Sequence, residues 1–198
     1  MKKSYFSKSF NLNIYLFIIS ALGFLFSTML NYLILRLDNI KLLSPPTLQH
    51  LTKLHHSALL VSSLVLTCLV LSVTAEVISR SLTDSVLNYL KSIFATVRFR
   101  QFARQNERIN KTPTDTSTQI SVNPIFRDFN RAVGKSVVDI TRQKIFVYIK
   151  IPRSQQSQKI LREMEAMIKE EISSRNPDYY FSSPERFKNH LWFIGTKR

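Results

Sequence analysis

The sequence predicts an α-helical transmembrane hairpin of two spans, followed by a basic juxtamembrane helix and a small cytoplasmic α+β domain with an antiparallel sheet. Two observations predict the hairpin: residues 9–35 contain no charged side chain, and neither do residues 54–75. A third observation predicts the domain. After Gly134 the spacing of apolar residues changes from helical steps to the alternation typical of strands.

The two uncharged runs are long enough to cross a bilayer. A helix needs roughly 20 apolar residues to cross a hydrocarbon core of about 30 Å, and residues 14–35 and 57–75 each approach that length. A buried helix of a soluble bundle would carry a polar stripe, which both runs lack. A cleaved signal peptide is the alternative for the first run, but this run is longer than an h-region of about 7 to 15 residues. We therefore predict spans at 11–35 and 57–79.

Basic residues around the runs predict their orientation, because lysine and arginine are retained on the cytoplasmic side of a membrane. The tail (1–10) contains three of them and residues 80–111 contain seven, whereas the loop at 36–56 contains three. We expect a multi-pass protein of the cytoplasmic membrane with both termini in the cytoplasm. Pro45-Pro46 would break the helix in the outer loop and turn the chain back.

Residues 80–110 are predicted to form a basic amphipathic helix. Apolar residues recur at helical steps and mark one face; they are Leu82, Val86, Leu90, Ile93 and Val97. Beyond them, arginines alternate with phenylalanines. We expect contact with anionic lipid or nucleic acid at Arg98, Arg100, Arg104, Arg108, Lys111, Phe99 and Phe102.

Three interpretations of this basic helix are open. It could lie on a bilayer, because each Lys or Arg near anionic headgroups contributes about 1 kcal/mol. It could bind nucleic acid through phosphate contacts and base stacking. It could also be a topology signal followed by a helix that packs on a partner.

Residues 111–124 are polar, contain two prolines and are predicted to form a linker before the domain at 125–198. Residues 125–133 have helical apolar spacing, and Gly134 can end that helix, although the start of a strand is the alternative for so short a piece. Strands at 136–141 and 144–152 form a predicted hairpin through Arg142-Gln143. In the second strand, alternation places Ile145, Val147, Ile149 and Ile151 on the core face and Phe146, Tyr148 and Lys150 on the other.

Residues 154–176 form the clearest helix outside the spans, and Pro177 ends it. Its apolar stripe consists of Ile160, Leu161, Met164, Met167, Ile168 and Ile172. Residues 179–181 and 190–196 supply two further strands around a turn at 182–184. The resulting order of helices and strands predicts that the stripe packs on an antiparallel sheet.

Size and charge limit the classes of function. The chain has 198 residues and a formal charge of +15, from 28 Lys and Arg against 13 Asp and Glu. The residues after the hairpin suffice for one small domain, not for a kinase or a nucleotide-driven motor. The charge favours anionic partners such as lipid headgroups or nucleic acid.

Motifs for catalysis are absent from the sequence. No phosphate-binding glycine loop is present, and the single Cys68 lies inside the second run, which excludes a disulfide scaffold. His50, His55 and His56 lack a nearby carboxylate and are better explained as an interfacial cluster than as a metal site. We therefore expect a protein without catalytic residues, cofactor or metal.

Two segments of the chain resemble part of a known family. They are NPIFRDFNRAVGKSVVDITRQKIFVYIKIPRSQQSQKILREMEAMIKEEI (123–172) and NHLWFIGTK (189–197). They resemble the small α+β section that precedes the motor in FtsK/SpoIIIE-type conjugative coupling ATPases. Those proteins also open with a basic tail, two membrane helices and a basic juxtamembrane helix. Because no phosphate loop is present in this chain, the resemblance implies a membrane and adaptor module and no ATPase residue.

These observations predict a non-enzymatic membrane-anchored adaptor that places a cytoplasmic partner, or a DNA-processing complex of plasmid or conjugative type, at the membrane. Two alternatives are a two-span membrane effector or toxin of a defence system, controlled by a ligand-sensing domain, and an auxiliary subunit of a larger membrane complex. The expected partners are the lipid bilayer and a cytoplasmic protein. Nucleic acid and a second copy of the chain are further candidates.

Overall fold

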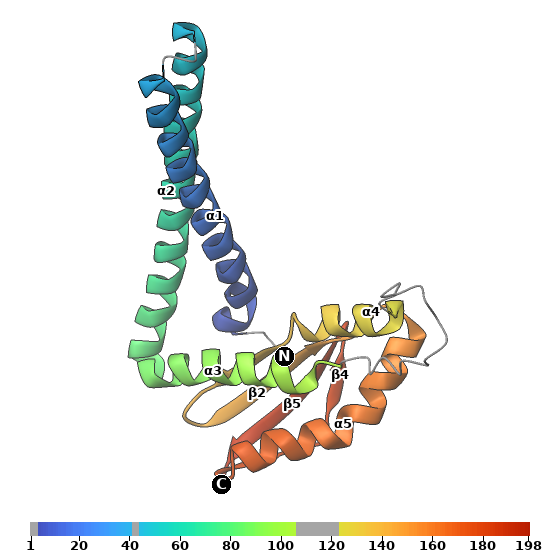
Figure 1. Cartoon of the computed structure of the whole chain (residues 1–198). Coiled ribbons are helices and arrows are strands. Elements are labelled where there is room, and N and C mark those ends of the chain that lie inside the picture. Colours follow the sequence, from blue (N-terminus) through green and yellow to red (C-terminus); the bar gives the residue numbers. More distant parts are fainter. Residues whose placement is uncertain (1–3, 41–43, 106–122) are drawn as a thin grey trace, which may run out of the picture. The chain divides into compact units, whose positions relative to one another are not determined.

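The computed structural model describes residues 4–40, 44–105 and 123–198. The chain divides into two compact units, Met1–Ser79 and Arg80–Arg198 (Figure 1). The division falls inside a helix, so the last turn of that helix belongs to the second unit. Each unit is described by itself.

The first unit contains two long helices, α1 (Tyr5–Asn39) and α2 (Pro45–Thr83), the second of which continues into the next unit. Both are long and apolar enough to span a membrane. Ser4 caps the start of α1, where its hydroxyl accepts a hydrogen bond from the backbone N–H of Ser7. The prediction of two long apolar helices is therefore confirmed.

Small and polar side chains join α1 to α2. The Ser27 hydroxyl lies 2.9 Å from Nδ1 of His55, and the Ser72 hydroxyl donates to Oδ1 of Asn13 at 2.8 Å. Between these contacts the backbones come close together at Gly23, where an added Cβ would lie 2.1 Å from the hydroxyl oxygen of Ser62. Close approach at small residues, with polar contacts between helices, is the usual packing of helices in membranes.

The connection between these helices is shorter than we expected. Residues 45–56, which we placed in the outer loop, form the first turns of α2. Pro45 and Pro46 therefore begin a helix and do not break one. Their missing N–H groups fall in the first turn, where an N–H has no partner within the helix.

The second unit contains a five-stranded sheet in which every pair is antiparallel. The strands are β1 (Val137–Ile140), β2 (Lys144–Lys150), β3 (Tyr179–Phe181), β4 (Glu185–Phe187) and β5 (His190–Lys197). The order is β1-β2-β5-β3, and β4 pairs with the other half of β5. The predicted hairpin, the later strands and the antiparallel sheet are thus confirmed.

Strand β4 was not predicted. Its three residues are all exposed, so they show no alternation that a sequence pattern could reveal. A two-residue turn joins it to β5, and Lys188 in that turn has a φ of 54°. The Phe187 ring meets the Trp192 ring edge to face, with 5.8 Å between the ring centroids.

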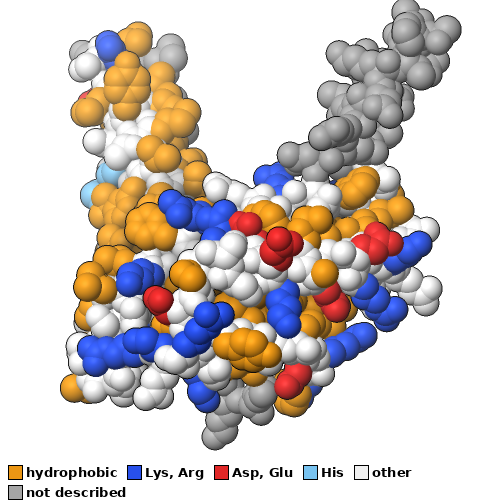
Figure 2. All heavy atoms as spheres, turned by 90° about the horizontal axis from the view of Figure 1, so that it is seen from below, with side chains coloured by type: hydrophobic (Ala, Val, Ile, Leu, Met, Phe, Trp, Pro, Cys, Tyr) orange, Lys and Arg blue, Asp and Glu red, His pale blue; other side chains and the backbone are white. Residues whose placement is uncertain are grey.

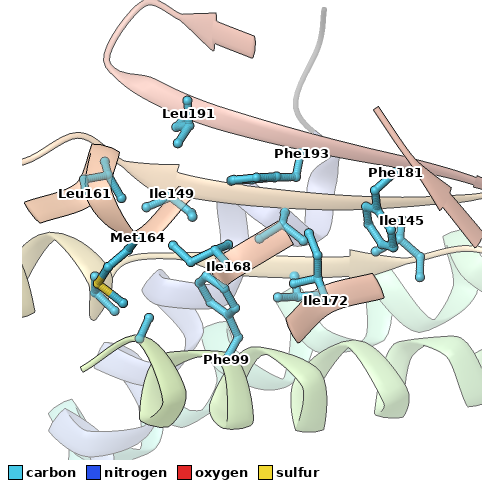
Figure 3. Packing of buried hydrophobic residues seen from close by; sticks show 14 of the residues in the cluster. Phe99, Ile145, Ile149, Leu161, Met164, Ile168, Ile172, Phe181, Leu191 and Phe193 are labelled. Carbon is cyan, nitrogen blue, oxygen red and sulfur yellow. The ribbon is translucent and has the colours of Figure 1, made fainter. Parts of the chain in front are cut away.

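Three helices accompany the sheet: α3 (Val86–Ala103), α4 (Pro124–Val133) and α5 (Gln155–Arg175). All three contribute to one apolar core with β1, β2, β3 and β5 (Figure 3). Phe99 of α3 and Ile168 of α5 lie in this core together with Phe193 of β5. The basic helix therefore belongs to the folded domain instead of preceding it.

Most of the predicted core positions are confirmed. The α5 stripe buries Leu161, Met164, Ile168 and Ile172, and the predicted core face of β2 is buried. Met167 is the exception, since 54% of its side chain remains exposed. It follows Ala166 on the flank of the helix, one position away from the buried stripe.

Candidate binding surface on α3 and the adjoining groove

Helix α3 covers the free edge of strand β1 with side chains that recur every fourth residue. The three contacts are the Ser92 hydroxyl accepting from the Ile140 N–H at 2.8 Å, the Thr96 hydroxyl accepting from the Val138 N–H at 3.0 Å, and Nε of Arg100 donating to the Ser136 carbonyl at 2.8 Å. Four residues of helix rise about 6.0 Å and two residues of strand about 6.8 Å. The two spacings match closely enough for a row of contacts.

These contacts determine which side of α3 faces the domain. An uncovered edge strand presents unpaired N–H and C=O groups and invites pairing with another chain. Here Ser92 and Thr96 are fully buried against that edge, and Phe99 and Ala103 continue the same side of the helix into the core. The side of α3 that faces the domain therefore combines this polar row with apolar residues near the end of the helix.

The apolar side of α3, which includes Val86, Leu90 and Val97 of the predicted stripe, points outward. Val86, Leu87, Leu90, Phe94 and Val97 are between 40 and 67% exposed. Ser85 caps the helix at its start. Ser92, Thr96 and Arg100 occupy the side of α3 that faces the domain, so the apolar stripe remains at the surface.

The five basic residues among the predicted lipid or nucleic-acid contacts divide into three groups. Arg98 and Arg104 are exposed. Arg100 is partly buried and bonded to the Ser136 carbonyl. Arg108 and Lys111 lie outside the described residues.

The two predicted aromatic contacts are corrected by the structure. Phe99 is buried in the core of the second unit, and Phe102 packs against that core. Both lie on the side of α3 that faces the domain, and the ring of Phe99 is buried too deeply to stack on a base at the surface. The sequence pattern of alternating Arg and Phe did not show which of these residues face the domain.

A groove of about 730 Å³ runs between α3 and the end of α5. Its apolar lining includes Phe94 and Ala95 of α3, Ile140 of β1, Ile172 of α5 and Tyr179 of β3. No pattern in the sequence signals this groove, because the residues that line it come from separate segments of the chain.

Charged residues around the groove are predominantly basic. Lys91, Arg98, Arg142, Arg175 and Lys197 line it together with only two acidic residues, Glu171 and Asp178. Arg175 pairs with Glu171 on the same helix. Among the described residues, Lys91, Arg98 and Lys197 form no ion pair. Figure 2 shows one face of the molecule, on which Lys and Arg side chains surround hydrophobic patches.

Tyr179 is the titratable group that the groove perturbs. Its hydroxyl donates a hydrogen bond to the carbonyl of Thr141 at 2.9 Å. Burial raises the pKa of this phenol above its usual value, and the nearby carboxylates of Asp178 and Asp84 raise it further. The phenol therefore stays neutral at physiological pH and acts in the groove as a hydrogen-bonding group.

The histidine cluster lies along α2. His55 is bonded to Ser27 across the hairpin, and its ring centroid lies 5.2 Å from that of His56. Within the described part of the chain, no three His, Cys, Asp or Glu side chains lie close enough to hold a metal ion. The absence of a metal site stays a prediction for the whole chain.

Comparisons of this chain with models of known protein families, with curated proteins and with solved structures found no match. The resemblance to the conjugative coupling ATPases stays a prediction that these comparisons do not test. The α3 surface and the groove are therefore the features from which a function can be inferred.

Proposed function

We propose that this chain is a non-enzymatic, membrane-anchored adaptor whose groove between α3 and α5 binds a protein partner at the cytoplasmic face of the membrane. The groove carries the proposal. It combines an apolar lining with Lys91, Arg98 and Lys197, whose charges no described acidic residue pairs. A partner segment with apolar residues along one side and carboxylates along its margins would complement both features.

An amphipathic acidic helix is the partner segment that fits best. Helix-in-groove recognition uses apolar anchors about one turn apart, with charged residues at the margins that set register and partner choice. Phe94, Ile140 and Ile172 provide apolar surface for such anchors. The basic residues on the α3 and β5 sides would then meet carboxylates and disfavour basic segments.

Nucleic acid fits this surface less well than an acidic protein segment does. Arg98 and Arg104 are exposed and could contact phosphate, but the rings of Phe99 and Phe102 are directed into the domain. Without them the helix lacks the stacking platform that single-strand binding proteins use. In the adaptor proposal, the partner is a protein of a DNA-processing complex of conjugative type. That protein, and not this chain, contacts the DNA.

Photo-crosslinking in native membranes tests the groove. A photo-reactive phenylalanine analogue replaces Lys197 at the rim, and the matched control carries it at Lys159, which is 80% exposed near the other end of α5. We expect one protein adduct from position 197 and none from position 159. We also expect Arg98→Glu to abolish this adduct and a basic substitution in the crosslinked acidic segment to restore it.

Other results would contradict the proposal. Equal adducts from both positions, or an adduct that survives Arg98→Glu, would show that the groove is not the partner site. A nucleic-acid adduct that disappears with rising salt would favour phosphate binding instead. Growth arrest on expression, without any adduct, would favour the membrane effector.

The proposed orientation, with both termini in the cytoplasm, has its own test. After Cys68→Ser, a single cysteine is introduced at Ser44, just before α2, or at Ser183, between β3 and β4; both positions are exposed. A membrane-impermeant maleimide added to intact cells should label the first position and spare the second. The reverse pattern would invert the topology and remove the adaptor's access to a cytoplasmic partner.

A further inference from the structure

We propose that α3 is an interfacial helix whose outward apolar face lies in the headgroup region of an anionic bilayer. This inference rests on the membrane anchoring in the proposed function. Leu87 and Leu90, which carry it, lie outside the partner groove, whereas Phe94, Lys91 and Arg98 also line that groove. The observation that supports it is the orientation of α3 in the domain. The helix directs a polar row together with Phe99 and Ala103 into the domain, and an apolar row away from it.

The outward face is apolar along most of the helix. Val86, Leu87, Leu90, Phe94 and Val97 recur at helical steps, and Leu87 and Phe94 are 66 and 67% exposed. A contiguous exposed apolar patch on a folded domain usually marks a protein or membrane contact. Leu87 and Leu90 do not line the groove, so an occupant of the groove would leave them in water.

The helix cannot turn this face inward without a cost. Rotation would remove the Ser92 and Thr96 hydroxyls from the N–H groups of Ile140 and Val138. Those buried N–H groups would then lack partners, and unpaired buried polar groups are costly. The apolar face is therefore held at the surface by the same contacts that complete the sheet.

The charges around this face match an anionic surface. Helix α3 contains no Asp or Glu, whereas Lys91 and Arg98 lie three residues before and four residues after Phe94 and are exposed. Arg104 follows at the end of the helix and is also exposed. Long basic side chains beside an apolar face are typical of interfacial helices, in which the charged ends reach lipid phosphates.

Continuity with a span favours lipid over a second copy of the chain. The first residue of α3, Val86, follows Thr83, the last residue of α2, after only two residues. Three extended residue steps cover roughly 10 Å, so α3 begins close to the end of a helix that is long and apolar enough to span a membrane. The bilayer is thus an apolar phase within reach of the start of α3.

A lipid-depth measurement on the full chain tests the inference. Single cysteines at Leu87 or Leu90, in a Cys68→Ser background, carry an environment-sensitive fluorophore. The chain is placed in nanodiscs of phosphatidylcholine, with or without phosphatidylglycerol, that also contain spin-labelled quencher lipids. In discs with phosphatidylglycerol we expect a blue-shifted emission and quenching by the shallow label. A cysteine at Glu170, which is exposed on α5, is the control and should show neither effect.

The native Cys68 separates this inference from the membrane anchoring itself. It is exposed within α2, so its label should be quenched in every disc if α2 spans the bilayer. Quenching at Cys68 but not at Leu87 or Leu90 would overturn the interfacial role of α3 alone. Absence of quenching at Cys68 as well would overturn both. A blue shift at Leu87 without lipid quenching would show that the apolar face of α3 contacts a second copy of the chain. That result would also contradict the inference.

Charge variants complete the test. Lys91→Glu with Arg98→Glu should reduce the quenching at Leu87 in discs with phosphatidylglycerol and leave the label at Cys68 unchanged. Lys159→Glu, at an exposed position of α5, is the matched reversal and should have no effect. Equal quenching in both variants would show that anionic headgroups do not hold the helix. The emission of Trp192, the only tryptophan, verifies that each variant is folded.

Discussion

The guanidinium of Arg80, in the last turn of α2, pairs with the carboxylate of Asp139 in β1, and both side chains are buried. Its Nη1 also donates to the Ile140 carbonyl at 3.0 Å and lies 3.6 Å from a carboxylate oxygen of Asp84. The sequence predicted for Arg80 only the role of a basic flank after a span. In the structure it is a buried cation that joins the start of the second unit to its edge strand.

Loss of one partner of this buried pair should be strongly destabilising. We expect Arg80→Met to lower the free energy of unfolding by about 3 to 5 kcal/mol, because the buried carboxylate of Asp139 would keep its desolvation cost without a cation. Urea unfolding of the full chain in detergent, followed by Trp192 emission, measures this change. Trp192 is suitable because its side chain is only 2% exposed.

Two further variants separate the charge effect from lost packing. Arg80→Met combined with Asp139→Leu should recover part of the loss, since no buried charge would remain at position 139. Lys159→Met removes an exposed pair with Glu163 and should cost at most about 1 kcal/mol. A loss for Arg80→Met no larger than that of Lys159→Met would contradict the importance of the buried pair.

The edge contact of Thr96 gives a second prediction. Thr96→Val keeps the shape of the side chain but leaves the buried N–H of Val138 without its acceptor. We expect a loss of about 1 to 3 kcal/mol in the free energy of unfolding and faster hydrogen exchange at the Val138 amide. Thr96→Ser retains the hydroxyl and should be much closer to the native chain. Unchanged exchange at Val138 in the valine variant would indicate that another group protects the edge.

Elements whose signal is local were predicted well. The two apolar helices follow from uncharged runs, α5 follows from its stripe and from Pro177 at its end, and β2 follows from alternation. In each case residues only a few positions apart share one environment. A periodic pattern therefore carries enough information to place the element and its buried face.

Features that depend on distant residues were not predicted. The orientation of α3 is decided by hydroxyl contacts between Thr96 and Val138, which are 42 residues apart, and between Ser92 and Ile140, 48 residues apart. The apolar period of α3 is the same whichever face is inside, so the pattern alone could not decide which face packs on the domain. The groove was missed for the same reason, since α3 and the end of α5 meet only in the folded domain.

The contact between α4 and α5 predicts a dependence on pH. The carboxylate of Asp128 accepts hydrogen bonds from the backbone N–H groups of Arg153 and Ser154, at 3.1 and 2.9 Å. These bonds, chiefly the one from Ser154, hold the pKa of Asp128 below its usual value near 3.8. A lowered pKa in the folded state means that the stabilisation is present at pH values above 3.8 and is lost as pH falls through the folded pKa.

Asp128→Asn should remove this pH dependence. We expect a loss of about 1 kcal/mol at neutral pH, modest because the carboxylate is partly exposed and screened by solvent. The difference from the native chain should shrink as pH falls below about 4. Urea unfolding at a series of pH values measures it, with Glu170→Gln as the exposed control. A difference that stays constant down to about pH 3 would mean that the charge of Asp128 contributes nothing.

Gly195 in β5 lies under the ring of Phe181 in β3, and the two residues should be energetically coupled. A Cβ at position 195 would come within 2.7 Å of that ring, which is buried in the core and cannot swing away freely. We expect Gly195→Ala to lower the free energy of unfolding by about 1 to 3 kcal/mol through overpacking. Phe181→Leu should leave room for the added methyl group, so the double variant should lose less than the two single variants together.

Gly134→Ala is the control, because its Cβ would come no closer than 3.1 Å to a neighbour, and it should stay within about 1 kcal/mol of the native chain. Strictly additive losses at positions 181 and 195 would show that the ring of Phe181 does not determine the cost of a side chain at Gly195 and that another feature of β5 requires glycine there.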